Sequence, residues 1–449
     1  MKQTKDVVLI NAPSQFYSVD SMGNEMQTDK TYSVGLAYVS SSVKRAGFDA
    51  GFIDGNFYRI PVDDIVEQVA EQRPEAVGMN VTLPNLSVVL ETARKIKDSY
   101  DPLIIIGGPG ATLLHDKIIS HDSIDVVVRN EGEITVPKVL SGAELEYIPG
   151  ITYKKNSVAV VNSRSEPITD LDSLAFPDTS IIPDELKETG IVSMFTTRGC
   201  SNQCTYCSTP QIWDRKIKFR SPESMIEEID NYRRDFELKE IHFLDDTFTV
   251  SRKRLNAFLD AYVASGMHKD VKWRCLSRIN TVDEETLIRM KDAGCYHISY
   301  GIESANEDVL KRIRKNITPE KAKDVCEMTS SIGIKTKAFF MIGFPWETEK
   351  EIKETLDYAA ALDVDRVGIN IVKAYPGTVL YEEVNRMFPY TSGFSSGIDY
   401  KGPEKIQQCL NKYAAIPERS CNPYFSTQEL LGFAEQGFQR FMENRGEIQ

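Results

Sequence analysis

The stretch Thr196-Thr197-Arg198-Gly199-Cys200-Ser201-Asn202-Gln203-Cys204-Thr205-Tyr206-Cys207 carries the strongest structural signal in the chain. Its cysteines follow the spacing Cys-x3-Cys-x2-Cys. Three thiolates this close together can hold three irons of a cubane cluster and leave the fourth iron open to a chelating ligand. A closed zinc site needs a fourth ligand, and the nearest in sequence, His242 and Cys275, form no second pair. Three unliganded buried cysteines are a further alternative, which the surrounding polar and glycine residues disfavour.

Strand and helix patterns alternate around and after this segment. Strands are expected at Ile191–Thr197, Glu240–Asp246, Lys272–Arg278, His297–Glu303, Thr336–Gly343 and Arg366–Tyr375. Helices are expected at Pro222–Arg234, Arg252–Ser265, Asp283–Ala293, Pro319–Ile332 and Thr348–Ala361. Six such units predict a partial (β/α)6 barrel that is open on one side, with its chemistry at the carboxyl ends of the strands.

Polar or glycine residues stand where these strands end. They are Asp245 and Asp246, Ser277 and Arg278, Gly301 and Glu303, and Gly343. Each is an ordinary strand-to-loop transition when taken alone. Because the carboxyl ends of parallel strands meet at one edge, the whole set is expected to converge on the cysteine segment.

The first third of the chain predicts a second sheet. Strands are expected at Val7–Asn11, Ala50–Asp54, Ala76–Val81, Leu103–Ile106 and Ile124–Val128, with helices at Tyr32–Gly47, Val62–Gln72 and Ser87–Asp98. This alternation is typical of a doubly wound, parallel α/β sheet of the Rossmann-like kind. Such sheets bind ligands beyond the carboxyl ends of their strands.

The turn Gly107-Gly108-Pro109-Gly110 lies at one of those ends. Glycine has no Cβ, so the turn allows backbone to approach a ligand closely. It is neither a dinucleotide fingerprint, which would follow the first strand, nor a phosphate-binding P-loop. A tight strand-to-helix turn without a ligand is the simpler alternative.

The cysteine spacing, with the aromatic Tyr206 before the last cysteine, resembles the radical S-adenosylmethionine (SAM) superfamily. The flanking Thr197-Arg198-Gly199 and the order of the two sheets resemble its cobalamin-binding subgroup, over about residues 6–385. The resemblance implies a [4Fe-4S] cluster on Cys200, Cys204 and Cys207, with SAM on its open iron. The reduced cluster would cleave SAM to methionine and a 5′-deoxyadenosyl radical, which abstracts hydrogen from carbon.

The resemblance also implies catalytic roles. Asp245 is expected beside the methionyl amine of SAM, and Glu303, with Ser277 or Arg278, at its ribose or carboxylate. Arg278 suits a carboxylate because its planar fork matches that group. A salt bridge inside the barrel is the alternative for Arg278.

Four further residues are expected to bind SAM by the same resemblance. Gly343 would give backbone access to adenine, and Tyr206 would pack against the ring. Asp246 and Gly301 complete the set at this edge.

Cobalamin would bind the first sheet. The expected contacts are Pro13, Gly35, Asp54, Thr82, Leu83, Gly107, Gly108, Pro109, Gly110 and Glu131. The cobalt-ligating pattern Asp-x-His-x-x-Gly is replaced here by Asp54-Gly55-Asn56-Phe57-Tyr58-Arg59, so cobalamin is expected without a histidine ligand. Where relatives often carry a histidine after Gly-Gly-Pro, this chain has Gly110.

The expected activity is methylation of an unactivated carbon of a small-molecule or natural-product substrate. One alternative is a cobalamin-independent radical dehydratase, epimerase or other hydrogen-abstracting enzyme that keeps the first sheet as a scaffold. A non-enzymatic iron–sulfur or cobalamin sensor is another, and the polar strand ends argue against it.

The expected domains are residues 1–140 for the cobalamin-binding sheet, a linker at 141–190, the partial barrel at 191–385 and a mostly helical capping region at 386–449. A hairpin is expected within Gly150–Asn162. The helix Gln428–Asn444 carries an apolar stripe that predicts a docking face. Cys409 and Cys421 are candidates to reach the substrate from this region, although an inert thiol is the simpler interpretation.

Composition limits the partners. The net charge is −13, from 53 basic and 66 acidic residues, which disfavours general nucleic-acid binding. No apolar run reaches the roughly 20 residues that span a bilayer, and no signal peptide is visible. Eight cysteines, three of them within eight residues and five scattered, are too few for a disulfide scaffold in 449 residues. These features predict a cytoplasmic protein with no nucleic-acid or membrane partner. The family resemblance implies an electron donor such as flavodoxin or ferredoxin.

Overall fold

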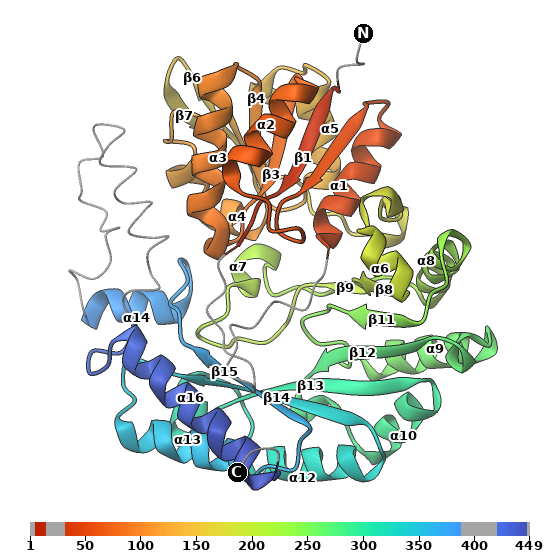
Figure 1. Ribbon diagram of the computed structural model, residues 1–449, viewed down its shortest axis with the longest axis vertical. Helices are drawn as coiled ribbons and strands as arrows, with labels where there is room; N and C mark the ends of the chain where they lie inside the picture. Colours follow the sequence, from red (N-terminus) through yellow and green to blue (C-terminus); the bar gives the residue numbers. More distant parts are fainter. Residues whose placement is uncertain (1–4, 15–31, 388–419, 447–449) are drawn as a thin grey trace. The chain divides into compact units, whose positions relative to one another are not determined.

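The computed structural model describes residues 5–14, 32–387 and 420–446 (Figure 1). These residues form two compact units. The first comprises residues 5–14 and 32–183, and the second comprises residues 184–387 and 420–446. Each unit is built on its own mainly parallel sheet, which confirms the predicted α/β fold class.

The first unit contains a seven-stranded sheet with the order β2-β1-β3-β4-β5-β6-β7. Its strands are β1 (Val7–Asn11), β2 (Ala50–Asp54), β3 (Ala76–Asn80), β4 (Leu103–Gly107), β5 (Val126–Val128), β6 (Ile151–Lys155) and β7 (Val158–Val161). Its helices are α1 (Val34–Arg45), α2 (Val62–Gln72), α3 (Leu86–Ser99), α4 (Pro109–Ile118) and α5 (Gly132–Leu140). Strands β1 to β5 run parallel, as predicted.

The strand order reverses between β1 and β3. Parallel sheets bind ligands at such a reversal, outside the carboxyl ends of the strands. Those ends are Asn11 and Asn80 in this unit. The strands here are almost fully buried, since helices cover a parallel sheet on both faces.

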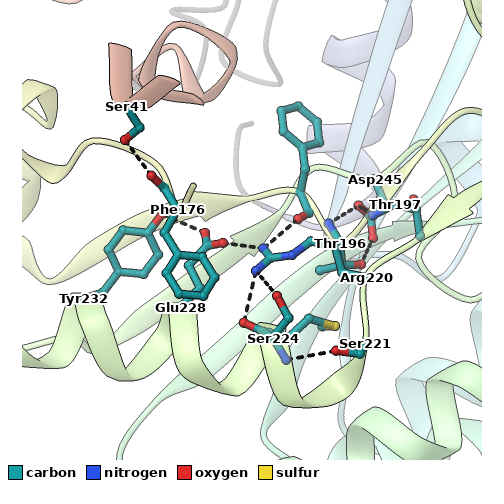
Figure 2. A network of polar contacts seen from close by, with 12 residues as sticks. Ser41, Phe176, Thr196, Thr197, Arg220, Ser221, Ser224, Glu228, Tyr232 and Asp245 are labelled. Carbon is teal, nitrogen blue, oxygen red and sulfur yellow. Dashed lines mark hydrogen bonds and ion pairs between the residues drawn. The ribbon is translucent and has the colours of Figure 1, made fainter. Parts of the chain in front are cut away.

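Residues 141–183, expected to be mainly a linker, are part of the first unit. The predicted hairpin forms as β6 and β7 and extends the sheet antiparallel to β5. Further along, the Ser41 hydroxyl donates to the Phe176 carbonyl oxygen at 2.6 Å (Figure 2). The Asp178 carboxylate accepts from Ser40 and pairs with Lys44, both on α1. These contacts explain why the stretch packs against α1.

The second unit contains a six-stranded sheet with the order β15-β14-β13-β12-β11-β8, parallel throughout. Its strands are β8 (Ile191–Met194), β11 (Glu240–Phe243), β12 (Lys272–Ser277), β13 (Cys295–Glu303), β14 (Lys335–Ile342) and β15 (Arg366–Ile371), with a small antiparallel pair β9 (Thr197–Arg198) and β10 (Lys218–Phe219). Strands β8 and β15 do not pair, so the barrel is partial, as predicted.

Ten helices accompany this second sheet within the described residues. They are α6 (Asp184–Thr189), α7 (Thr209–Trp213), α8 (Pro222–Asp235), α9 (Arg252–Ala264), α10 (Glu284–Asp292), α11 (Glu307–Arg312), α12 (Pro319–Ser331), α13 (Glu349–Ala361), α14 (Val379–Met387) and α16 (Thr427–Asn444). Aromatic side chains fill the layer between strands and helices. The Phe243 ring stacks on Phe248 and meets Phe258 and Trp273 edge-on.

Helix α16 docks on α13 and β15 through the predicted apolar stripe. Leu430, Phe438 and Phe441 are buried. A Cβ at Gly437 would lie 2.7 Å from the Leu356 side chain and 2.9 Å from the Ile369 side chain. The predicted docking face is therefore confirmed. Within the described ranges, no helix combines the length and apolar character needed to cross a membrane.

Candidate functional site

The cysteine segment lies between β9 and α7, at the carboxyl edge of the second sheet. Gly199 opens it with a φ of +92°, and a Cβ there would lie 2.1 Å from the Lys216 carbonyl oxygen. Only glycine fits this turn without strain. Cys204 is buried, and Cys200 and Cys207 are half-buried. The Cys207 amide donates to the Cys204 carbonyl oxygen at 3.2 Å, which tightens the loop.

Two side chains donate toward the sulfurs. Asn202 Nδ2 lies 3.2 Å from Cys200 Sγ, and Arg278 Nη1 lies 3.6 Å from Cys204 Sγ. Such donors stabilise thiolates and tune an iron–sulfur cluster. Among the described residues, no three His, Cys, Asp or Glu side chains are grouped as they would be around a single metal ion. It is the Cys-x3-Cys-x2-Cys spacing that fits three irons of a cubane, each with its own thiolate.

The chain enters this loop through a buried polar network (Figure 2). Asp245 Oδ1 accepts from the amides of Thr196 and Thr197 at 2.7 and 2.8 Å, and Oδ2 accepts from the Thr196 hydroxyl. Arg254 also donates to that hydroxyl. These bonds divert the chain at Thr196, so the single strand predicted at Ile191–Thr197 is split into β8 and β9.

Arg220 also stabilises the turn at Thr196. Its amide donates to the Thr196 carbonyl oxygen at 3.0 Å, and its guanidinium pairs with the buried Glu228 on α8. Arg220 Nη2 also donates to the Ser224 hydroxyl at 2.8 Å (Figure 2). Helix α8 therefore anchors the segment that precedes the cysteines.

The geometry corrects the role expected for Asp245. Both of its oxygens accept hydrogen bonds from Thr196 and Thr197, so the carboxylate positions the loop rather than facing a ligand. Its neighbour Asp246 is exposed, and Thr209, two residues after Cys207, donates to it at 3.3 Å. Asp246 is thus the carboxylate of this pair that is accessible beside the cysteine loop.

Glu303 lies at the end of β13 in a polar group that sequence reasoning did not identify in full. Its Oε1 accepts from Lys315 Nζ at 2.7 Å and from the Tyr206 hydroxyl at 3.0 Å. Both Glu303 and Lys315 are buried. Burial, followed by the Glu303 charge, raises the pKa of Tyr206 well above its usual value, so the phenol keeps its proton.

The group requires Gly301 beside it. A Cβ on Gly301 would lie 2.6 Å from Glu303 Oε1 and 2.9 Å from Lys315 Nζ. The register with β14 shifts between Gly301 and Glu303, and Glu303 takes a φ of 78°. Gly301 therefore makes room for the side chains of this group. In the sequence, Lys315 ends the basic run Lys311–Lys315. That run matches no motif spacing, so it did not identify Lys315 as a site residue.

Arg278 joins this group to the cysteine loop. Its Nη2 donates to the Lys315 carbonyl oxygen at 2.7 Å, while Nη1 points to Cys204. Its buried Nε has no hydrogen-bond partner in the part of the chain that the structure describes. A ligand carboxylate would fit this arginine. Neighbouring Ser277 instead shares its hydroxyl with Thr249 and Thr281, at 2.6 and 3.4 Å.

The surroundings of Gly343 also differ from the open backbone that was expected to contact adenine. Its amide and that of Phe344 donate to Glu347 Oε2 at 2.7 and 2.8 Å, so these backbone donors are already used. Burial raises the pKa of Glu347 to about 7. Asn422 Nδ2 caps the loop by donating to the carbonyl oxygens of Phe344 and Glu347 at 2.8 and 2.7 Å. The Tyr206 ring meets Phe344 edge-on at 6.3 Å.

Of the two tail cysteines, Cys409 lies outside the described residues. Cys421 is buried, and burial raises the pKa of its thiol to about 11. It lies near Lys373 and Ala374, which follow β15. Its place is thus close to the carboxyl end of the last strand.

In the first unit, the predicted cobalamin contacts include two contrasting sets. Asp54 is buried and Oδ1 accepts from Asn11 Nδ2 at 2.7 Å, whereas no described residue bonds to Oδ2. Desolvation raises the pKa of Asp54. This unpaired oxygen, at the end of β2, fits a polar ligand group. Gly107 and Gly35 also face open space.

The residues of the other set make contacts within the protein. A Cβ on Gly108 would lie 2.1 Å from Asn80 Oδ1, and one on Gly110 would lie 2.8 Å from the Val81 side chain. Pro109 begins α4. These residues serve the close approach of β3 and α4, as the alternative of a tight turn implied. Glu131 Oε2 accepts from the Ile168 amide at 2.7 Å, which is a structural contact.

The remaining predicted contacts stay at the expected edge. Thr82 and Leu83 are half-buried in the loop after β3, where Asn85 Oδ1 accepts from the Thr82 amide at 2.8 Å. Pro13, which follows β1, is half-buried as well. His121 precedes the amino end of β5, at the edge of the sheet opposite to these contacts. His115 Nδ1 bonds to the Thr152 hydroxyl at 3.0 Å.

Fold and site together define a two-unit protein with an iron–sulfur loop on a partial barrel and a ligand-binding sheet. The family model "Radical SAM superfamily" matches residues 194–359, and "B12 binding domain" matches residues 28–140. The chain is 33% identical over 361 residues to an uncharacterised methyltransferase of Pyrococcus horikoshii, covering 78% of this chain and 77% of the relative. The chain therefore belongs to the radical SAM superfamily and to its members with a B12-binding domain.

Two more comparisons show similarity in sequence and in fold. The anaerobic magnesium-protoporphyrin IX monomethyl ester cyclase of Cereibacter sphaeroides is 26% identical, over 78% of this chain and 60% of the cyclase. The fold is similar to that of the radical SAM methyltransferase TsrM from Kitasatospora setae, with a TM-score of 0.72 and 16% identity. That likeness covers 91% of this chain and 82% of TsrM.

Proposed function

We propose that this protein uses a [4Fe-4S] cluster, SAM and cobalamin to methylate an unactivated carbon of a small molecule. The observation that carries the proposal is the arrangement at the carboxyl edge of the second sheet, where Arg278 links the cysteine loop to the Glu303–Lys315–Tyr206 group. The B12-binding match over residues 28–140 and a relative named as a methyltransferase support methyl transfer.

The chain's own residues have separable tasks in this proposal. Cys200, Cys204 and Cys207 would hold three irons, and Arg278 would donate toward the Cys204 sulfur and toward the carboxylate of SAM. Glu303, fixed through Oε1 by Lys315 and Tyr206, would accept hydrogen bonds from the ribose or the amine through its other oxygen. When bound, the cluster supplies the electron that cleaves SAM, and cobalamin carries the methyl group.

The first unit is assigned to cobalamin, bound without a histidine ligand. Asp54 Oδ2 and the half-buried loop Thr82–Leu83 support this assignment. The functional domain limits 1–140, 141–190, 191–385 and 386–449 remain predictions of the same proposal, whereas by contacts alone residues 141–183 pack with the first unit. We further assign the protein to the reducing cytoplasm, with flavodoxin or ferredoxin as electron donor and no nucleic acid or membrane partner. The net charge of −13 and the free cysteines support this assignment.

An anaerobic reconstitution tests the function directly. The protein is loaded with iron, sulfide and cobalamin, desalted, and examined for retained corrin absorbance before SAM and reductant are added. Formation of 5′-deoxyadenosine with retained corrin supports the proposal and justifies a search for methyl acceptors. Deoxyadenosine without corrin would favour a cobalamin-independent radical enzyme, and no SAM cleavage would contradict the proposal.

A matched pair of cysteine variants checks the metal ligands. Cys204→Ala is expected to abolish the visible absorbance of the cluster, because one iron loses its thiolate. Cys326→Ala, at a buried thiol on α12, is the control and should retain the cluster. Equal iron content in both variants would contradict the assignment.

A further inference from the structure

Two segments of the second unit fold directly against the cysteine loop. Between α7 and β10, the chain returns to the start of the loop, where a Cβ on Gly199 would lie 2.1 Å from the Lys216 carbonyl oxygen. After α11, the Arg314 carbonyl oxygen lies 4.0 Å from Cys204 Sγ. Both segments therefore lie beside the residues that would hold the cluster.

These two segments are strongly basic. Residues 214–218 contain three cations and one acid, and residues 311–316 contain four cations and no acid. In a chain of net charge −13, both are local exceptions. Four of these cations interact within the protein: Lys218 with the Trp213 ring, Lys311 with Glu307, Arg312 with Glu383 and Lys315 with Glu303.

The other three cations form a set that we call the cationic rim: Arg215, Lys216 and Arg314. All three are exposed, and no described residue makes a hydrogen bond or an ion pair with their side chains. The backbone of Arg215, with a φ of 58°, and of Arg314, with a φ of 57°, lies in the left-handed region. Non-glycine residues rarely adopt this conformation, and it is concentrated at functional sites.

Aromatic side chains accompany the cationic rim. The half-buried Trp213 ring lies between Arg198 and Lys218, at 5.9 and 5.3 Å from its centroid. The Lys216 amide donates to the Trp213 carbonyl oxygen at 2.9 Å, so one turn carries both residues. Phe219, on β10, is 40% exposed. Accessible aromatic side chains beside arginine are typical of protein–protein interfaces.

The proposed chemistry requires an electron at this loop. Each reductive cleavage of SAM consumes one electron, so a separate redox protein must lose one electron to the cluster. A strongly acidic donor would be repelled by most of a surface whose net charge is −13. A local group of unpaired cations attracts and orients such a donor, because complementary potentials steer the encounter of two proteins.

We propose that the cationic rim, with Trp213 and Phe219, is the docking surface for an acidic one-electron donor protein. Carboxylates of the donor would pair with the three cations, while its redox group would lie next to the cysteine loop. This inference rests on the proposed function, because that function supplies the cluster that accepts the electron. It names the partner of that site and the face of the second unit that the partner contacts.

Titration calorimetry with flavodoxin tests the inference on the full-length, reconstituted protein. Oxidised flavodoxin is used, so that binding is measured without electron transfer. At about 20 mM salt, Arg215→Glu/Lys216→Glu/Arg314→Glu should bind flavodoxin about tenfold more weakly than wild-type protein. The difference should shrink at about 500 mM salt, because salt screens exposed charges.

A matched control separates position from net charge. Lys239→Glu/Lys269→Glu/Lys335→Glu makes the same change in charge at exposed positions beside the amino ends of β11, β12 and β14. This variant should bind flavodoxin within about twofold of wild-type protein. Equal weakening in both triple variants would overturn the inference, as would unchanged binding in the rim variant. An RNA oligonucleotide that binds the rim when flavodoxin does not would also overturn it.

A second measurement follows the electron. Flavodoxin hydroquinone should reduce the cluster about tenfold more slowly in the rim variant, whereas dithionite, which needs no docking surface, should reduce both proteins equally. If the rim variant does not retain its cluster, Arg314→Gln is measured, with about threefold weaker flavodoxin binding expected. Wild-type protein that binds flavodoxin and accepts its electron but cleaves no SAM would contradict the proposed function alone.

Discussion

Glu303 combines backbone strain with a buried charge. Its φ of 78° lies in a region that non-glycine residues rarely adopt, and it coincides with the register shift in β13. Such conformations cost about 1–3 kcal/mol and persist where surrounding contacts enforce them. Here the enforcing contacts are Lys315 and Tyr206. Strain at this residue is consistent with a binding role.

Replacing Glu303 tests how strongly the group is coupled. Glu303→Gln should lower the free energy of unfolding by about 3 kcal/mol, because it leaves the Lys315 ammonium buried without its counter-ion. Adding Lys315→Met should restore part of that loss, since the buried charge is then removed as well. Urea denaturation of the two proteins measures both effects. A double variant that is less stable than Glu303→Gln would contradict this coupling.

Glu347 predicts a pH-dependent stability. Burial raises its pKa from 4.5 to about 7 in the folded state, so folded protein holds this proton more tightly than unfolded protein. Its contribution is fully present below pH 4.5 and is lost as the pH rises toward 7. The stability difference between wild-type protein and Glu347→Gln should shift by roughly 3 kcal/mol over that range. Denaturation at several pH values checks this, and a constant difference would contradict it.

At the scale of single elements, the turn between β8 and β9 sets where the cysteine loop begins. Asp245→Asn should lower the free energy of unfolding by about 2 kcal/mol, because an amide cannot accept all three hydrogen bonds from Thr196 and Thr197. Asp246→Asn, one residue along and exposed, should change it by less than about 0.5 kcal/mol. Chemical denaturation compares them. Equal effects of the two substitutions on the free energy of unfolding would contradict the positioning role of Asp245.

Helix α16 offers a second comparison within one element. Gly437→Val should lower the free energy of unfolding by about 2 kcal/mol, since the added atoms meet Leu356 and Ile369. Gly432→Val, where nothing lies within 4 Å of the new Cβ, should change it by about 0.5 kcal/mol or less. Thermal unfolding measures the pair. Similar melting temperatures would mean that α16 is not packed as described.

At the scale of the whole molecule, each unit should respond to its own cofactor. Cobalamin at a hundred times its Kd should slow amide exchange in the first unit by up to about a hundredfold, because binding stabilises the folded form. The expected peptides cover residues 76–85 and 103–112, at the ends of β3 and β4. Hydrogen-exchange mass spectrometry on the intact chain measures this. Protection confined to residues 272–303 would contradict cobalamin binding by the first unit.

Local sequence patterns were sufficient for the helices and strands, and they indicated the cysteine motif. Alternating strand and helix periods predicted both parallel sheets, and the apolar stripe of α16 predicted its docking face. The spacing of Cys200, Cys204 and Cys207 predicted a cluster loop. These features depend on residues that are neighbours in the chain, so the sequence carries them directly.

The pairing of buried polar groups was decided by tertiary structure alone. Lys315 reaches Glu303 across 12 residues and Tyr206 across 109, and no spacing rule connects the three. Asp245 bonds to Thr196 and Thr197, and Glu347 bonds to the amide of Gly343, because buried carboxyl groups accept from the donors that the fold places beside them. Which donor is nearest depends on how distant segments meet, and only the folded chain fixes that.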